Sequence, residues 1–338
     1  MGAFSVADST VLIQRIISNE RDATADRIKQ GQSSRERLAS PGRSQEQRGD
    51  CMLPSIGMSA SPQLITAAYG MSAVAAWGTS DFLGGYATRR FNAFLFTAIV
   101  NLGGLILVAT LALASHSIFP SGHSAAWALA AGASGGAALA IFYRALSSGR
   151  MGLTAPVAAV LSAAIPTIFS IFTEGMPGKI QIAGFVLAAA GLWLITRATD
   201  GTAPEGIGLA VVAGIGFAGF YLCIRQAGNA SPLWLGSLTR SGGLVITSLI
   251  VLLRRNFHGM TASGLRWGVI TGGIDSLGTI LFILASQTGR LDEAVVISSL
   301  YPAVTVLLAR IVLKEHFTRW RFVGLVAALA AVPMIAAQ

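Results

Sequence analysis

The sequence is poor in charged residues, cysteine and recognisable nucleotide-binding motifs. Asp, Glu, Lys and Arg make up 12% of its 338 residues, against roughly 25% in an ordinary soluble domain. The two cysteines, Cys51 and Cys223, lie far apart and outside any CxxC motif, so neither a disulfide framework nor a zinc site is predicted. No GxxxxGKS or GxxxxGKT loop occurs for binding nucleotide phosphates. A soluble protein, a metal or cofactor site and an ATP-driven machine are therefore not expected.

Apolar sequence is what the chain has in abundance. Hydrophobic residues make up 53% of it, and the mean hydropathy is +0.64. About 20 apolar residues are needed to cross a bilayer. Ten segments of this length are predicted, at residues 63–88, 91–115, 124–148, 151–173, 178–197, 205–226, 232–254, 265–287, 291–313 and 319–337. The formal charge of +9 is concentrated at the ends of these segments and in the N-terminal tail, which favours membrane interfaces over nucleic-acid binding.

The apolar part of the sequence contains an internal repeat. Trp127 recurs as Trp267, 140 positions later, and Gly149-Arg150 recurs as Gly289-Arg290. Each copy contains five predicted spans, so the second copy must enter the membrane from the opposite face. Inverted repeats of this kind are typical of secondary transporters. We predict an all-α integral membrane protein with ten transmembrane helices, arranged as two inverted five-helix repeats over residues 63–200 and 203–338.

Residues 1–60 differ in composition from the rest of the chain. The stretch 20–50 is rich in Arg, Ser, Gln and acidic residues and has no aromatic residue, which predicts disorder. A second interpretation is that Met52 or Met58 is the true start and that the tail is a misassigned extension. Outside the tail, most Lys and Arg fall on the face opposite the N-terminus, which the positive-inside rule assigns to the cytoplasm.

Two charged residues are predicted deep inside the membrane. On a rise of about 1.5 Å per residue, Arg240 lies about 12 Å and Asp275 about 18 Å from the N-terminal face, so the two can pair. Each alone would cost at least ~2.5 kcal/mol at this depth. Either Asp275 exchanges a proton or a cationic substrate while Arg240 releases the Asp275 carboxylate, or Arg240 and Asp275 form a permanent structural pair. We favour the first, because ionisable groups inside membranes usually mark pathways.

Further residues are candidates for substrate contact. Asp81 is predicted near the opposite face, close enough to Arg144 to pair with it. The aromatic and polar side chains that could line a cavity are Trp77, Phe217, Tyr221, Tyr301, Asn101 and Ser298. Ordinary helix packing is the alternative role for the aromatic residues.

Prolines and glycines mark particular helices of the two copies. Pro156 and Pro166 are predicted to interrupt the fourth span, and Pro302 the ninth, its repeat partner. Interruptions in corresponding helices point to a substrate path and gating, and static kinks are the alternative. The small-xxx-small motifs at 132–136 and 268–272 predict close helix packing in the third and eighth spans.

Several short motifs resemble one transporter family. They are the segment 77–85 (WGTSDFLGG), Pro156, Pro166 and Glu174 in the fourth span, Tyr301-Pro302 with Lys314-Glu315, and Gly324. Together they make the chain similar to EamA-type members of the drug/metabolite transporter superfamily over residues 63–338. The resemblance implies a central cavity lined by the first four helices of each half. It also implies transport of amino acids, related metabolites or toxic organic compounds, often outward, and cytoplasmic termini, which conflict with the charge distribution.

The sequence therefore predicts a multi-pass protein of the bacterial inner membrane. We expect it to export a small metabolite by alternating access, with proton coupling as one option and a small-molecule substrate and the lipid bilayer as partners. A sugar-type permease, a lipid-carrier flippase and a structural scaffold remain alternatives, and monomer and homodimer remain open. Residues 132–135 (GASG) match the GxSG motif of intramembrane serine proteases, but no His falls at membrane depth to serve as the base. An enzyme is not expected.

Overall fold

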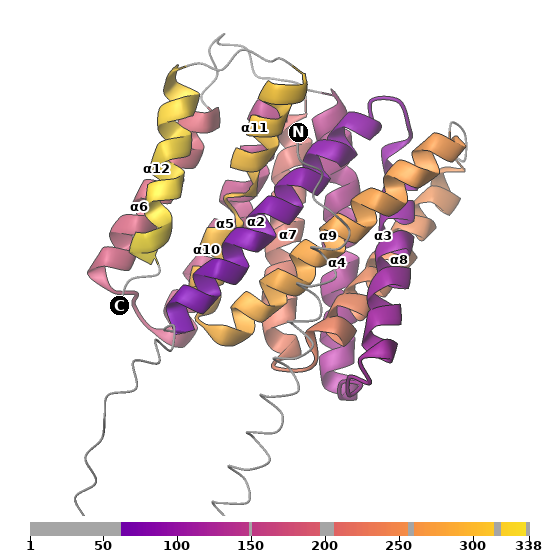
Figure 1. The fold of residues 1–338 in the computed structure, drawn as a ribbon, viewed down its shortest axis with the longest axis horizontal. Coiled ribbons are helices and arrows are strands. Elements are labelled where there is room, and N and C mark those ends of the chain that lie inside the picture. The colour runs from indigo at the N-terminus through magenta and orange to yellow at the C-terminus, as the bar shows by residue number, and fades with distance from the viewer. Residues whose placement is uncertain (1–61, 149–150, 197–205, 256–259, 314–318, 336–338) are drawn as a thin grey trace, which may run out of the picture. The chain divides into compact units, whose positions relative to one another are not determined.

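The described part of the chain consists of α-helices joined by short connections. The computed structural model describes residues 62–148, 151–196, 206–255, 260–313 and 319–335, all within a single unit that spans residues 60–338. The predicted tail at 1–60 and the alternative starts lie outside these residues. The helices are α2 (Pro62–Ala87), α3 (Ala93–Ala114), α4 (Gly122–Ser148), α5 (Met151–Glu174), α6 (Lys179–Thr196), α7 (Ile207–Ala227), α8 (Pro232–Arg254), α9 (Ala262–Thr288), α10 (Leu291–Ser298), α11 (Tyr301–Val312) and α12 (Arg319–Ile335) (Figure 1).

Within the part of the chain that the structure describes, six segments are long and apolar enough to cross a membrane. They are α3, α4, α7, α8, α9 and the combined α10 and α11, residues Leu291–Val312. The predicted ninth span is thus two helices that meet at Ser299 and Leu300. α2, α5, α6 and α12 occupy the remaining four predicted ranges without being counted among these six segments. An all-helical architecture is confirmed, while ten crossings stay a prediction.

Local sequence signals set several helix boundaries. The Asn92 side chain accepts hydrogen bonds from the backbone N–H groups of Phe94 (3.0 Å) and Leu95 (3.1 Å), which caps α3. Thr261 caps α9 in the same way by accepting from Gly264 N at 3.2 Å. α8 begins at Pro232, where a helix needs no backbone donor.

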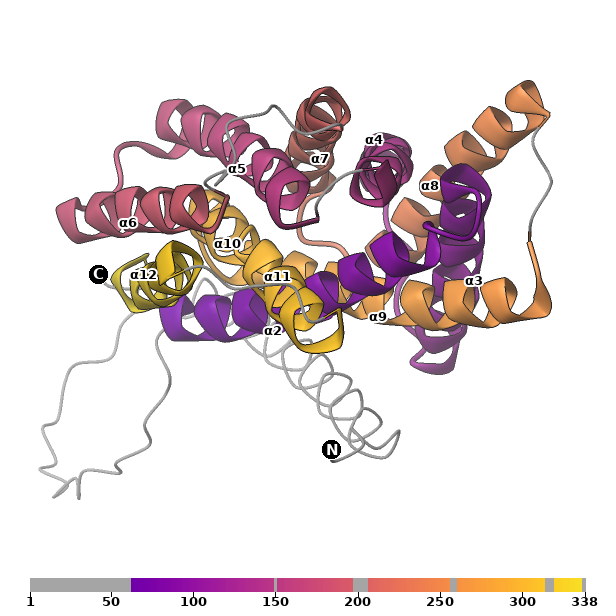
Figure 2. The same ribbon diagram turned by 90° about the horizontal axis from the view of Figure 1, so that it is seen from above.

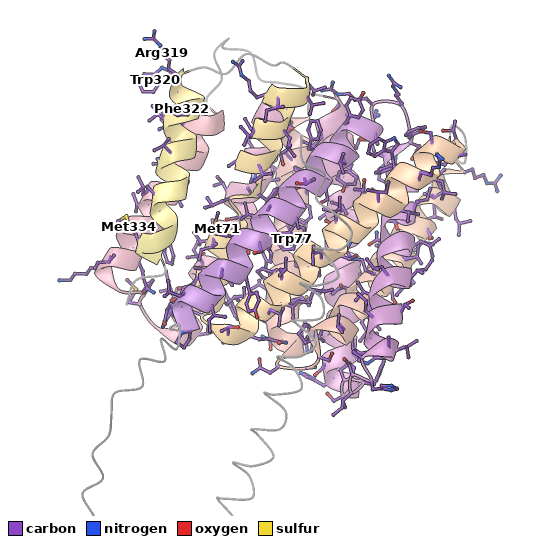
Figure 3. The ribbon with its side chains drawn as sticks, in the orientation of Figure 1. Met71, Trp77, Arg319, Trp320, Phe322 and Met334 are labelled. Atoms are coloured by element: carbon purple, nitrogen blue, oxygen red, sulfur yellow. The ribbon has the colours of Figure 1, made fainter. Side chains whose placement is uncertain are left out.

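Helices of the first half pack mainly against helices of the second half. α4 packs on α7 and α8, α3 on α8 and α9, and α2 on α9, α10 and α11. α6 and α12 pack against each other, and among the other helices α6 contacts mainly α5 while α12 contacts α10; Figures 1 and 2 show the pair side by side. Figure 3 shows Arg319, Trp320 and Phe322 at one end of α12 and Met334 near the other end. An Arg-Trp pair at a helix end is typical of a membrane interface.

The two small-residue motifs lie where the halves make their closest approach. A Cβ atom added at Gly132 or Gly136 of α4 would collide with the backbone of α8, at Thr239 and Gly243. A Cβ added at Gly272 of α9 would collide with the Val100 carbonyl of α3. The predicted close packing is therefore observed at both motifs. Each lies on the third helix of its half and faces the second helix of the other half.

Candidate functional site

The two charges predicted at membrane depth form a buried ion pair. Arg240 of α8 donates from Nη1 to Asp275 Oδ2, and both residues are almost completely buried, with 6% and 5% of their surface exposed. Nη2 of Arg240 donates to the backbone oxygen of Asp275 at 3.3 Å and to Thr279 Oγ1. Ser80 of α2 donates to Asp275 Oδ1 at 3.2 Å. Two helices, α8 and α2, one from each half of the chain, thus hold the Asp275 carboxylate of α9.

Glycine makes room for this ion pair. A Cβ added at Gly104 of α3 would lie 3.1 Å from Arg240 Cδ and would collide with Ser276 Oγ. α3 can therefore approach the Arg240 side chain closely and exclude lipid from it. Thr279 follows Asp275 by one helical turn, so it shares the face of α9 that meets Arg240. That spacing could have revealed Thr279 in the sequence, whereas nothing there pointed to Ser80.

The ion pair lies at the wall of a small cavity between the two halves. The cavity has a volume of about 70 Å³. Eight of the nine residues that the sequence suggested for substrate contact or coupling line it, and their functional role stays a prediction. They are Trp77 and Asp81 of α2, Asn101 of α3, Phe217 and Tyr221 of α7, Arg240 of α8, Asp275 of α9 and Tyr301 of α11. Ser298, the ninth, is not among the lining residues. Lining residues that the sequence did not suggest for this role include Leu139, Phe220, Thr239 and Thr279.

Asp81 is the third ionisable side chain of the cavity. It is 5% exposed and lies close enough to Asp275 to interact with it electrostatically. Its carboxylate forms no hydrogen bond or ion pair with the side chains and backbone that the structure describes. The expected pairing with Arg144 is wrong, because Arg144 is exposed at the far end of α4 and lines a separate groove beside Arg254.

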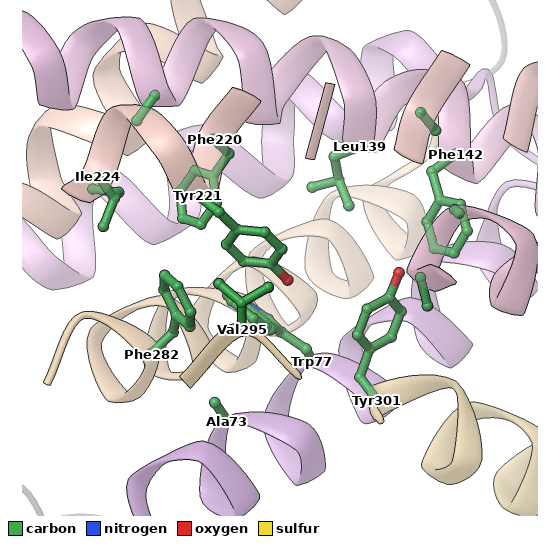
Figure 4. Packing of buried hydrophobic residues seen from close by; sticks show 14 of the residues in the cluster. Ala73, Trp77, Leu139, Phe142, Phe220, Tyr221, Ile224, Phe282, Val295 and Tyr301 are labelled. Carbon is green, nitrogen blue, oxygen red and sulfur yellow. The ribbon is translucent and has the colours of Figure 1, made fainter. Parts of the chain in front are cut away.

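Aromatic rings form one side of the cavity. Trp77 lies 5.5 Å from the ring of Phe282 and 6.2 Å from the ring of Tyr221, measured between centroids, and Tyr221 lies 4.8 Å from Phe282. Figure 4 shows these three rings gathered together, with Tyr301 opposite Tyr221. The Tyr301 hydroxyl is buried and has no hydrogen-bond partner among the described residues. It is thus a polar group at the cavity that is free to bond a ligand.

The three prolines behave differently from one another. α5 continues as a helix through both Pro156 and Pro166. The ninth span breaks at residues 299–300, and Pro302 occupies the first turn of α11, where its missing N–H costs no helical hydrogen bond. The predicted interruption is therefore found only in the ninth span, next to the cavity residue Tyr301. The gating role of all three prolines stays a prediction.

The sequence did not point to a second group of buried acids, at the start of α10. Asp292 accepts from Arg290 Nη2 at 3.0 Å, and Glu293 Oε1 accepts from Gln181 Nε2 of α6 at 2.7 Å. Both acidic residues are buried in the first turn of α10, where a helix favours negative charge. They do not line the cavity. Glu293 joins α10 to α6, whereas Asp292 bonds Arg290 at the start of its own helix. No cluster of His, Cys, Asp or Glu in the described ranges could hold a metal ion.

Comparison with known proteins identifies the family of this chain. The EamA-like transporter family matches it twice, over residues 64–197 and 204–337. No curated protein matches it. A solved structure titled "Crystal structure of protein" has a TM-score of 0.67 and 17% sequence identity, and the similarity covers 80% of this chain and 97% of that chain. At this identity the likeness shows the fold alone. Since the two family matches cover most of the sequence, the chain belongs to the EamA-like transporter family and is a membrane transporter of the drug/metabolite transporter type.

Proposed function

We propose that the protein is a secondary transporter that exports a small metabolite by alternating access across the bacterial inner membrane. The observation that carries this proposal is the cavity between the two halves, with its buried Arg240–Asp275 pair. Buried ionisable groups at membrane depth are costly and usually serve transport. In the proposed cycle the cavity opens to one face and then to the other, as the halves rock around it.

The proposed architecture is two inverted repeats of five spans each, over residues 63–200 and 203–338. The helix contacts support it, because the most extensive contacts between the halves have counterparts with the halves exchanged. The first half's third helix packs on the second half's second helix (α4 on α8), and the reverse pair, α9 on α3, packs equally closely. Likewise α2 on α9 is matched by α7 on α4, and α5 on α7 by the α10–α11 span on α2. Such exchange is what a two-fold axis relating the two halves produces, and the odd number of five spans in each half is the reason for proposing that this axis lies in the membrane plane.

The break between α10 and α11 is the proposed gate. A discontinuous helix exposes free backbone groups and can bend at the break more easily than an intact one. Tyr301 directly follows the break and lines the cavity. Movement of α11 at residues 299–300 would therefore shift Tyr301 relative to the ion pair. We propose that Pro302 fixes the position of this hinge, and that Pro156 and Pro166 weaken α5, its partner in the other half.

The coupling proposal assigns proton exchange to Asp275. Arg240, Ser80 and Thr279 organise this carboxylate, so its proton affinity would depend on whether Arg240 stays in place. A cycle in which Arg240 leaves Asp275 would link proton binding to the movement of α8 against α9. The cavity, at about 70 Å³, gives no support to the alternative of a lipid-linked sugar as substrate.

Transport in proteoliposomes tests this function. Vesicles containing a trapped pH-sensitive dye are challenged with amino acids, amines and drug-like cations. Proton movement triggered by one class and abolished in Asp275→Asn is the expected result. Glu293→Gln is the matched control, because it also neutralises a buried acid but lies outside the cavity. Normal gradient-driven transport by folded Asp275→Asn would refute coupling at this residue. Silence of the wild-type protein with every substrate class would refute proton coupling and would favour an uncoupled facilitator or a lipid-linked substrate.

A further inference from the structure

The charges that line the cavity do not balance. Arg240 is the positive side chain there, and Asp275 and Asp81 are the negative ones. Arg240 is committed to Asp275 by an ion pair and to the Asp275 backbone oxygen by a second hydrogen bond. Asp81 is left without a cation or a hydrogen-bond donor among the described residues, although only 5% of its surface is exposed. A buried carboxylate in this position is unfavourable unless a proton or another positive charge neutralises it.

The surroundings of Asp81 are suited to an organic cation. Trp77 precedes Asp81 by four residues on α2, so the two side chains lie on the same face of the helix. Tyr221 and Tyr301 also line the cavity within electrostatic reach of Asp81. Aromatic faces attract ammonium groups, most strongly where water is excluded. The free Tyr301 hydroxyl adds an oxygen that can accept a hydrogen bond from an ammonium N–H.

An anionic substrate fits the cavity poorly. The two Nη atoms of Arg240 already bond Asp275 and Thr279, and only its buried Nε has no partner among the described residues. A carboxylate or phosphate could therefore form a two-pronged bond with this guanidinium only by displacing one of these groups. It would also meet the unneutralised charge of Asp81. A substrate carrying one positive charge instead brings the charges lining the cavity to zero.

We propose that the ligand of this cavity is a small organic ammonium compound, whose charged nitrogen binds the Asp81 carboxylate between Trp77, Tyr221 and Tyr301. The inference rests on the proposed function, since it names the substrate class of the same cavity. It gives Asp81 and Asp275 different roles. Asp81 binds the cation, and the Arg240–Asp275 pair couples that binding to proton exchange in the proposed cycle.

Ligand charge is tested directly by using pairs of compounds with nearly the same shape. The purified full-length protein in detergent micelles is titrated with choline and with 2-phenylethylamine, and binding is measured by calorimetry. The neutral counterparts are 3,3-dimethylbutan-1-ol and 2-phenylethanol. We expect at least one cation to bind and its neutral counterpart to bind at least about 30-fold more weakly, the loss typical of removing one partner of a buried charge pair.

Variants then assign the binding to Asp81. Asp81→Asn should weaken binding of the cation by at least about 30-fold and remove the preference over the neutral compound. Glu293→Gln should bind the cation as the wild-type protein does, because Glu293 lies outside the cavity. Should Asp81→Asn fail to fold, the comparison of charged and neutral ligands on the wild-type protein decides by itself.

Three outcomes would overturn the inference: equal binding of charged and neutral partners, unchanged cation binding by Asp81→Asn, and no binding of either cation. Failure of the transport proposal looks different. Cation binding in micelles without substrate movement in proteoliposomes would leave the ligand class standing and remove the transporter cycle. If only neutral or anionic substrates moved in proteoliposomes, the transporter cycle would stand and the proposed ligand class would be wrong.

Discussion

Replacing Arg240 by Met tests whether the buried ion pair stabilises the contact between α8 and α9. The substitution keeps an unbranched side chain of similar length but removes the cation that serves Asp275 and Thr279. It leaves Asp275 and Asp81 as two unneutralised carboxylates in one cavity. Breaking a buried pair by removing one partner costs about 3–5 kcal/mol, and we expect Arg240→Met to lose an amount in this range.

Asp275→Asn should lower the free energy of unfolding less than Arg240→Met does, because the side chain that remains keeps more of its hydrogen bonds. An amide at position 275 can still accept a hydrogen bond from Arg240, and the guanidinium keeps its bonds to the backbone oxygen of residue 275 and to Thr279. We expect a loss of about 1–2 kcal/mol, the cost of a weakened hydrogen bond to a charged group. Adding Asp275→Asn to Arg240→Met removes the stranded carboxylate, so the double variant should be more stable than Arg240→Met by about 2 kcal/mol.

The assay is reversible unfolding in mixed micelles, with helix content followed as the fraction of denaturing detergent rises. All three variants and the wild-type protein are compared at the same lipid-to-detergent ratio and pH. The reasoning is refuted if the double variant is less stable than Arg240→Met, or if the two single losses simply add. Additive losses would mean that the two side chains do not interact across α8 and α9.

Two further predictions concern helix packing and the contact between α6 and α10. Gly136→Val should destabilise the protein by about 2 kcal/mol, because it forces α4 away from α8. The control Gly122→Val should change stability by less than about 0.5 kcal/mol, since a Cβ at Gly122 meets nothing within 4 Å. Equal losses for the two variants in micelle unfolding would contradict the close-packing argument. Gln181→Leu should destabilise the protein by about 1–2 kcal/mol, because it removes the 2.7 Å hydrogen bond to Glu293. Glu293→Gln should destabilise it less, because an amide oxygen still accepts that bond. The reverse order would show that this hydrogen bond does not join the two helices.

Much of the helix layout was predictable from the sequence. The predicted segments at 124–148 and 232–254 correspond to α4 and α8 within two residues at each end, because apolar runs and their Gly, Pro and Ser punctuation are local signals. The break in the ninth span was expected at Pro302 and lies two residues before it. Pro166 produced no break in α5, because proline removes only one backbone donor and packing against α7 and α10 holds the helix together.

The sequence predicted which residues line the site better than it predicted which residues contact one another. Depth along a helix follows from a fixed rise per residue, so the sequence could bring Arg240 and Asp275 to within reach of each other. The same reasoning gave a wrong partner for Asp81, since similar depth says nothing about the direction in which a side chain faces around its helix axis. Ser80 was missed for the same reason.

The helical segments, the two related halves and the few charged residues among apolar ones can all be read from the sequence, because these properties depend on neighbours along the chain. The partners of the buried charges cannot be read in this way. The packed helices show that Arg240 bonds Asp275, that Asp81 has no cation among the described residues, and that Arg144 lines a separate groove. Glycine contacts between the halves fix the rotation of each helix about its axis, and this rotation sets which buried charges meet.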